Sequence, residues 1–210
     1  RNSVRHFARV MTPAYEPLPS AGRAEGDDSW NGAGDRGDAA MIACGAARYA
    51  LARGDRAEAA ELWPLVEWCL EYCRRQLTAD GVVASDPDEL EGRFPTGEAN
   101  LCTSTLYYDA LLSAVSLGRE LGVESAQTAR YAAQARALAR AIDAHFGGEV
   151  GGYDTYRYYA GNTLLRSWIC MPLIVGLKER SEGTVRALLG PELMTDDGLL
   201  TQQGSSTFWD

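Results

Sequence analysis

The feature that most constrains this fold is an alternation of two kinds of helix along the chain. Segments that are apolar and small nearly all round begin near Asp38, Glu98 and Asn162, so the pattern recurs about every 60 residues. A helix of that kind must be buried on most of its sides. Each is followed, after a short turn, by a segment with one apolar stripe and one charged face. Such repetition indicates helical hairpins that pack against one another.

Three hairpins are expected within one domain. Their bounds are 38–52 with 56–77, 98–121 with 125–146, and 162–178, kinked at Pro172, with 181–189. Residues 1–26 contain three prolines and show no sustained period, so they are expected to form an extended lead-in. The domain then covers residues 27–210.

The connections alternate in length as well. Turns within a hairpin are short, whereas the connections between hairpins are long and rich in Asp, Glu, Arg, Tyr and Trp. If the buried helices lie inside a ring and the amphipathic ones outside, all long connections emerge on one face and converge on one pocket. A tetratricopeptide array is the alternative, but it repeats at about 34 residues with short loops throughout. The sequence therefore predicts an all-α fold of ring-forming hairpins, about half a ring, since 195–210 opens as though another buried helix should follow.

The connection before the second buried helix carries the main functional signal. Its charged residues crowd within thirteen positions: Asp86, Asp88, Glu89, Glu91, Arg93 and Glu98. Residues 99–117 follow, and their only charged residue is Asp109. Carboxylates at the rim of a rigid helix suit general acid/base chemistry on sugars, in which one group donates a proton while another stays ionised. A solvated acidic loop is the alternative interpretation.

The hairpins and their loops resemble the six-hairpin (α/α) toroid glycosidases, a group that includes glucoamylase-like, trehalase-like and α-L-rhamnosidase-like enzymes. Trp30 and the later Asp35-Arg36-Gly37-Asp38 are similar to the tryptophan and Arg-Asp element that grips the non-reducing sugar in glucoamylase-like enzymes. Gly37 separates Arg36 from Asp38, so either Asp35 or Asp38 is the counterpart. The resemblance implies a glycoside hydrolase acting on an oligo- or polysaccharide.

The resemblance also implies roles for individual residues. The 86–91 connection is similar to the acid-bearing loop of those families, so Glu89 or Glu91 would be the proton donor. Glu89 is favoured, because it lies at the centre of the cluster, whereas Arg93 would keep Glu91 ionised. Such enzymes are mostly inverting, so a second carboxylate would activate water. The substrate-binding residues expected are Trp30, Asp35, Arg36, Asp38, Asp88, Tyr153, Arg157 and Tyr159, with Tyr156 and Tyr158 as further flat faces.

The resemblance implies a carbohydrate substrate, and the composition argues against two other kinds of partner. The net charge is −9 and no Lys/Arg cluster occurs, which argues against nucleic acid and anionic membranes. Cys69 and Cys73 are four residues apart, but neither His6 nor His145 lies near them, so no metal or other cofactor is expected. An odd number of cysteines favours a reducing cytoplasm, although a secreted or periplasmic location stays open.

Two other functional classes remain open from sequence. A non-hydrolytic toroid enzyme, such as a sugar epimerase or a lyase, would share the helices. Sugar epimerases of this shape use catalytic histidines, however, and neither histidine of this chain precedes a buried helix in a long loop. The other class is a non-catalytic carbohydrate-binding or scaffold protein. In either case a half ring is expected to be completed by the rest of a parent chain or by a homodimer partner.

Overall fold

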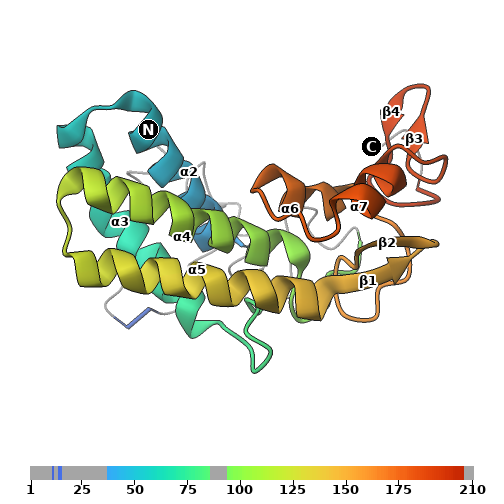
Figure 1. The fold of residues 1–210 in the computed structure, drawn as a ribbon, viewed down its shortest axis with the longest axis horizontal. Coiled ribbons are helices and arrows are strands. Elements are labelled where there is room, and N and C mark those ends of the chain that lie inside the picture. The colour runs from blue at the N-terminus through green and yellow to red at the C-terminus, as the bar shows by residue number, and fades with distance from the viewer. Residues whose placement is uncertain (1–10, 12–13, 16–36, 86–93, 206–210) are drawn as a thin grey trace, which may run out of the picture.

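The computed structural model describes residue 11, residues 14–15, residues 37–85 and residues 94–205. Two long helical hairpins dominate this part of the chain (Figure 1). They consist of α2 (Asp38–Arg53) with α3 (Arg56–Arg75), and α4 (Leu101–Leu121) with α5 (Ser125–Phe146). The first two of the three expected hairpins are therefore present, although α4 begins at Leu101 because Ala99 and Asn100 form extended bridges first.

Burial follows the sequence in the second hairpin, whereas in the first hairpin α2 buries 8 of its 16 residues and α3 buries 11 of its 20, so the predicted contrast is absent there. Helix α2 packs against both α3 and α4, and α4 packs against α5. The side chains that α2 buries are small, which allows close approach of helix axes: Ala39, Ala40, Ala43, Ala46, Ala47 and Ala50. Helix α4 buries 14 of its 21 residues, whereas α5 buries only 6 of its 22, along one stripe. Helices α2 and α4 thus form an inner layer between α3 and α5.

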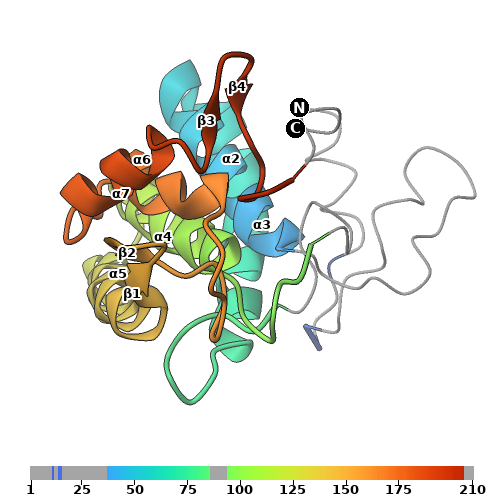
Figure 2. The same ribbon diagram turned by 90° about the vertical axis from the view of Figure 1, so that its right-hand side faces the viewer.

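The two hairpins run the same way, so their short turns share one end of the molecule. Arg56, at the start of α3, donates from Nη2 to the Leu121 carbonyl oxygen at 2.8 Å and also donates to the Glu120 carbonyl oxygen. At the opposite end, Gly37 before α2 lies against Thr103 in the first turn of α4. The first turns of α2 and α4 therefore lie together at that end, which faces the viewer in Figure 2.

The prediction of a third buried helix over 162–178 is wrong. The segment forms a 3₁₀ turn, η2 (Ser167–Cys170), and a single helical turn, α6 (Met171–Ile174), which contact α4. Backbone pairing of residues 165–167 with 201–203 keeps the start of the segment extended. Pro172 supplies no N–H donor, and Gly176, at φ 88°, ends the helical turn. The short helix that was expected to follow is present as α7 (Ser181–Leu188).

The all-α prediction also needs correction, since two small antiparallel ribbons interrupt the helices. Strands β1 (Gly147–Val150) and β2 (Tyr153–Tyr156) pair directly after α5, with Gly147 opposite Tyr156. Strands β3 (Met194–Thr195) and β4 (Gly198–Leu199) form the second ribbon. The first ribbon arises where a glycine- and aromatic-rich loop was predicted, because Gly151 and Gly152 adopt positive φ and close a tight turn. Over the described residues, no helix is long and apolar enough to cross a membrane.

Gly37 and Gly45 provide a matched test of the inner layer. Gly37 has φ 88°, and a Cβ there would lie 2.7 Å from Thr103 Oγ1, whereas a Cβ on Gly45 would meet nothing within 4 Å. We expect Gly37→Ala to lower the free energy of unfolding by about 1–3 kcal/mol, because it forces a strained backbone against α4. Gly45→Ala should raise it by about 0.5–1 kcal/mol, since alanine is the better helix former. Denaturant unfolding of both variants would measure the difference, and equal effects would contradict the α2–α4 contact.

Candidate functional site

The end of the molecule that carries the long connections is the candidate site. We name this region the mouth and define it by residues 37–38, 84–85, 94–103, 158–159 and 166, which contact one another across the chain. The first turns of α2 and α4 lie side by side there. Helix N-termini carry partial positive charge, so the mouth favours carboxylates and developing oxyanions.

Asn100 joins two connections at the entrance to α4. Its side chain is fully buried, and its Oδ1 accepts a hydrogen bond from the Thr103 amide at 2.9 Å, which caps the helix. Its Nδ2 donates to the Ser85 carbonyl oxygen at 3.1 Å, and the Ser85 amide donates to the Glu98 carbonyl oxygen at 2.9 Å. The Asn100 side chain therefore caps α4 and also holds Ser85, which precedes the acidic connection in the sequence.

The connection from the β1–β2 ribbon packs on the same entrance. Asn100 forms a bridge with Tyr159, and the Leu101 amide donates to the Tyr158 carbonyl oxygen at 2.8 Å. Tyr159 is half-buried, and its side chain covers Gly97 so closely that a Cβ there would lie 2.8 Å from Tyr159 Cβ. Gly97 therefore lets the two connections touch.

Arg166 is the largest fully buried side chain of the mouth. Its guanidinium carbon lies 4.0 Å from the ring centroid of Tyr158 and 5.1 Å from that of Phe94. Its Nη1 donates to the Pro95 carbonyl oxygen at 3.0 Å. Sequence reasoning missed this residue. The signal that could have found it is that Arg166 is the only charged residue between positions 162 and 177, as Asp109 is between positions 99 and 117.

The predicted site residues divide into three groups. Most of them lie outside the described residues: Trp30, Asp35, Arg36, Asp88, Glu89 and Glu91. Asp38 and Tyr159 lie at the mouth, Asp38 as the buried first residue of α2. Tyr153 begins β2 and donates to Glu192 Oε2 at 3.3 Å, whereas Arg157 directly follows β2 and donates to the Gly147 carbonyl oxygen at 2.9 Å. The structure thus gives these last two residues partners within the C-terminal part of the chain.

Tyr156 and Tyr158 do not offer open ring faces, which corrects the expectation that they stack on sugars. Their exposed fractions are 1% and 0%. Burial raises the pKa of Tyr156 to about 12. Tyr158 has one ring face against Arg166 and contacts Trp168 edge-on at 5.9 Å. Both rings are therefore buried, Tyr158 at the mouth and Tyr156 in β2 opposite Gly147.

Asp109 belongs to the interior of the α2–α4 interface. It lies in an ion pair with Arg48, at 2.6 Å from Arg48 Nε, and accepts a hydrogen bond from Cys44 Sγ at 2.9 Å. Burial, followed by the hydrogen bond to Asp109, raises the pKa of the Cys44 thiol to about 12. The thiol therefore stays protonated and unreactive. Among the described residues, no group of three or more His, Cys, Asp and Glu side chains could hold a metal ion.

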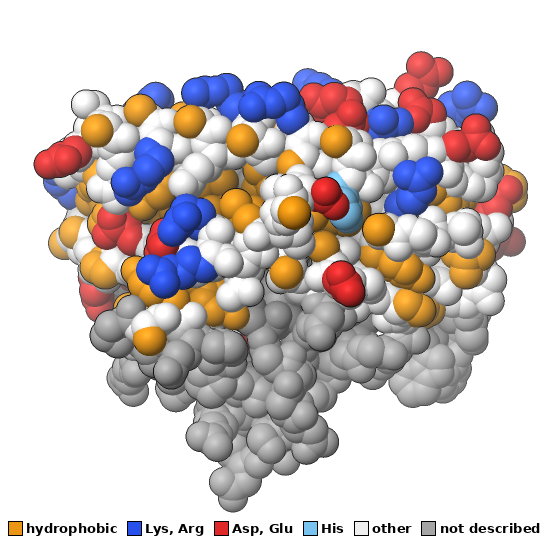
Figure 3. All heavy atoms as spheres, turned by 90° about the horizontal axis from the view of Figure 1, so that it is seen from below, with side chains coloured by type: hydrophobic (Ala, Val, Ile, Leu, Met, Phe, Trp, Pro, Cys, Tyr) orange, Lys and Arg blue, Asp and Glu red, His pale blue; other side chains and the backbone are white. Residues whose placement is uncertain are grey.

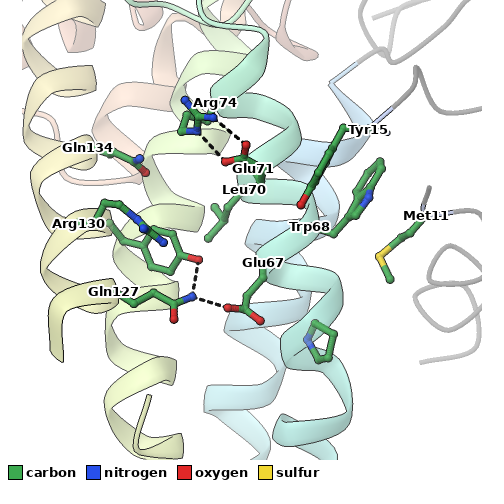
Figure 4. A pocket seen from close by; sticks show the side chains of 12 residues that line it. Met11, Tyr15, Glu67, Trp68, Leu70, Glu71, Arg74, Gln127, Arg130 and Gln134 are labelled. Carbon is green, nitrogen blue, oxygen red and sulfur yellow. Dashed lines mark hydrogen bonds and ion pairs between the residues drawn. The ribbon is translucent and has the colours of Figure 1, made fainter. Parts of the chain in front are cut away.

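A separate groove of about 660 Å³ lies on the outer face, between α3, α5 and the side chains of Met11 and Tyr15 (Figure 4). Its polar groups pair with one another: Gln127 donates to Glu67 and to the Tyr131 hydroxyl, and Glu71 binds Arg74. The Tyr15 ring is covered by Trp68 at 5.5 Å and by Arg75 at 4.2 Å, so neither face is open to a sugar. Basic, acidic and hydrophobic side chains are interspersed on the face seen in Figure 3.

Comparison with known proteins gives a likeness of fold. No family model matches the sequence, and no curated protein matches it. Among solved structures, the chain is similar to the GH78 family rhamnosidase of Bacillus sp. GL1, with a TM-score of 0.59 and 20% sequence identity. The match covers 71% of this chain and 17% of that rhamnosidase. The chain therefore has a glycosidase-like, helix-rich fold and spans less than a fifth of that enzyme.

The double role of Asn100 is testable by substitution. Asn100→Ala should lower the free energy of unfolding by about 1–3 kcal/mol, because it removes the cap and leaves the buried Ser85 carbonyl oxygen without this donor. Asn100→Ser should recover part of the loss, since serine can cap the helix but is too short to replace both bonds. Denaturant unfolding measures both effects. A loss of equal size in the two variants would show that capping contributes nothing.

Glu71 should make stability depend on acid pH. Hydrogen bonds from Arg74, and then from Arg75, lower the pKa of Glu71 from 4.5 to about 2. A lowered folded-state pKa contributes stability above pH 4.5 that is lost as the pH falls towards 2. The melting temperature of Glu71→Gln should therefore lie below that of the wild type at pH 7, and the gap should narrow at pH 3. Glu120→Gln, at the exposed end of α4, is the control. A gap that stays constant with pH would contradict the ion-pair assignment.

Proposed function

We propose that the chain is part of a glycoside hydrolase that cleaves an oligo- or polysaccharide by general acid/base catalysis. The observation that carries this proposal is the mouth. The N-terminal ends of two adjacent buried helices meet two long polar connections there, in a fold similar to that of a rhamnosidase. The similarity is one of fold, so the assignment of chemistry depends on the residues around the mouth.

The proposed architecture is a partial (α/α) toroid of the six-hairpin glycosidase type. The arrangement of α2 and α4 inside and α3 and α5 outside is what a segment of such a ring requires. Further hairpins, from the rest of a parent chain or from a second copy, would complete the ring. The mouth would then become one wall of an enclosed sugar pocket.

Each proposed role follows from what glycosidic cleavage demands. Glu89, with Glu91 as the alternative, would donate a proton to the leaving oxygen, and a carboxylate on the opposite wall would activate water with inversion. Asp38 and Tyr159, at the mouth, would bind sugar hydroxyls, together with Trp30, Asp35, Arg36 and Asp88. No cofactor enters this mechanism.

A second enzyme class draws less support. The epimerase alternative needs histidines at the mouth, and His145 instead lies near the end of α5, where its Nδ1 is 3.1 Å from Asp80 Oδ2. A binding or scaffold protein would share the fold and lack turnover, so catalysis itself separates it from a hydrolase.

Substitution of the proposed donor tests the function. In the natural full-length protein, Glu89→Gln should lower turnover about 10²–10⁴-fold, because the amide cannot donate a proton to the leaving group. Substrate affinity and melting temperature should stay close to wild type. The measurement is hydrolysis of a panel of 4-nitrophenyl glycosides, including the α-L-rhamnoside, with the anomer of the product followed by NMR.

The panel has a control and two contrary outcomes. Glu149→Gln, an exposed carboxylate in β1, should keep full activity. Wild-type rates in Glu89→Gln with loss in Glu91→Gln would move the donor to Glu91 and keep the class. If the wild type cleaves none of the glycosides but binds oligosaccharides, the protein is a binding scaffold and the hydrolase proposal fails.

A further inference from the structure

Glu98 is an exposed carboxylate of the mouth to which the proposed mechanism gives no role. The described mouth contains two acidic residues, Asp38 and Glu98. Asp38 is only 8% exposed, whereas Glu98 lies on the surface, two residues before the cap of α4. A ligand at the mouth can therefore reach the Glu98 oxygens directly.

The backbone on both sides of Glu98 is held by other segments. Its carbonyl oxygen accepts a hydrogen bond from the Ser85 amide at 2.9 Å, and the next residue, Ala99, bridges to Ala84. Asn100 then follows, fully buried. The exposed side chain of Glu98 therefore starts from a fixed backbone. A group held in this way loses less conformational entropy on binding a ligand than one on a free loop.

Tyr159 lies beside the same stretch of backbone. Gly97, with φ 68°, passes so close to the Tyr159 side chain that a Cβ on Gly97 would lie 2.8 Å from Tyr159 Cβ and 3.1 Å from Cγ of the ring. After Glu98, Asn100 bridges to the backbone of Tyr159. Contacts just before and just after Glu98 thus bring an aromatic side chain next to the segment that carries the carboxylate.

We propose that Glu98 is a specificity-determining residue of the mouth, where its carboxylate accepts hydrogen bonds from the hydroxyl groups of a neutral sugar ring that packs beside Tyr159. The inference rests on the sugar site of the proposed function and adds to it a residue and a class of substrate. An ionised carboxylate has only acceptors, so it binds hydroxyl donors and repels a second carboxylate. The subsite therefore favours neutral sugars over uronic acids.

The test compares Glu98→Gln and Glu98→Asp with Glu124→Gln in the natural full-length protein, on the 4-nitrophenyl glycoside that the wild type cleaves fastest. Glu124 is the matched control, since it is also an exposed carboxylate at the start of a helix, α5, at the opposite end of the molecule. We expect Glu98→Gln to raise KM about 10–100-fold with kcat little changed, because a lost hydrogen bond to a charged group weakens substrate and transition state alike.

Glu98→Asp separates sugar binding from a role in helix stability. Aspartate keeps the negative charge near the start of α4 but is one methylene group shorter, so it cannot reach the same hydroxyl groups. KM should therefore rise in this variant too. If Glu98 only stabilised the N-terminus of α4, aspartate would restore wild-type behaviour.

Gly97→Ala tests the placement of Tyr159 without altering a proposed sugar-binding side chain. The new Cβ would force the Tyr159 side chain to move. Gly54→Ala is the control for backbone strain, since Gly54 has φ 66° and a Cβ there would meet nothing within 4 Å. Both variants should have lower melting temperatures. Only Gly97→Ala should raise KM, by about 2–10-fold, the range expected for a displaced aromatic contact.

The glycoside panel tests the class of substrate. It should pair neutral glycosides with uronides that differ only at C6, such as the glucoside with the glucuronide and the galactoside with the galacturonide. The wild type should cleave neutral glycosides in preference to uronides, because a substrate carboxylate would be repelled by Glu98.

Each outcome decides the inference. Raised KM in both Glu98 variants and in Gly97→Ala, with wild-type KM in both controls, supports it. Wild-type KM in any of these three variants, or a uronide as the preferred substrate, overturns it and leaves the hydrolase proposal standing. Failure of both Glu98 variants to fold overturns it in favour of a structural role.

The two proposals can also fail separately in the other direction. If the wild type cleaves no glycoside but binds neutral oligosaccharides, and Glu98→Gln weakens that binding, the hydrolase proposal fails and this inference stands. A wild type that neither cleaves nor binds any of these sugars overturns both.

Discussion

The close approach of α2 to α4 is the contact on which the rest of the structure depends. Alanines on α2 leave little bulk between the helices, and Gly37 brings the backbone within reach of Thr103. Because both helices start at this contact, the connections that lead into them must arrive at the same end. The mouth therefore forms because the side chains between α2 and α4 in the inner layer are small.

Charged residues buried around the inner layer divide into two groups with different consequences. In the interior, Asp109 forms an ion pair with Arg48 and accepts a hydrogen bond from Cys44. These contacts occupy the Asp109 carboxylate and hold α2 against α4 in one orientation. At the mouth, Asp38 begins α2, and the Arg166 guanidinium contacts aromatic rings from two connections. Buried charges of this second kind organise irregular backbone, which has no repeating hydrogen-bond ladder to hold it.

Sequence reasoning succeeded where local periodicity and packing agree, and failed where distant segments competed. The two long hairpins follow directly from the spacing of apolar residues in 38–53, 56–75, 101–121 and 125–146. The 162–178 segment is as apolar as a buried helix, yet pairing of its first residues with 201–203 and the proline at 172 divide it. Leu164 and Ile174, with exposed fractions of 42% and 61%, show that hydrophobicity alone did not secure burial.

The sequence by itself determined the helical hairpins, the short and long connections and the concentration of carboxylates before α4, because these depend on residues close together in the chain. Only the tertiary structure decided that Asp38 and Tyr159 share the mouth, that Tyr156 and Tyr158 are buried, and that Arg166 joins connections at the mouth. The physical reason is that a side chain's burial and charge partners depend on which distant segments pack around it. The spacing of residues along the chain fixes the direction in which the Arg166 side chain can point. It does not determine that the rings of Phe94 and Tyr158 lie beside the guanidinium and offset the free-energy cost of burying its charge.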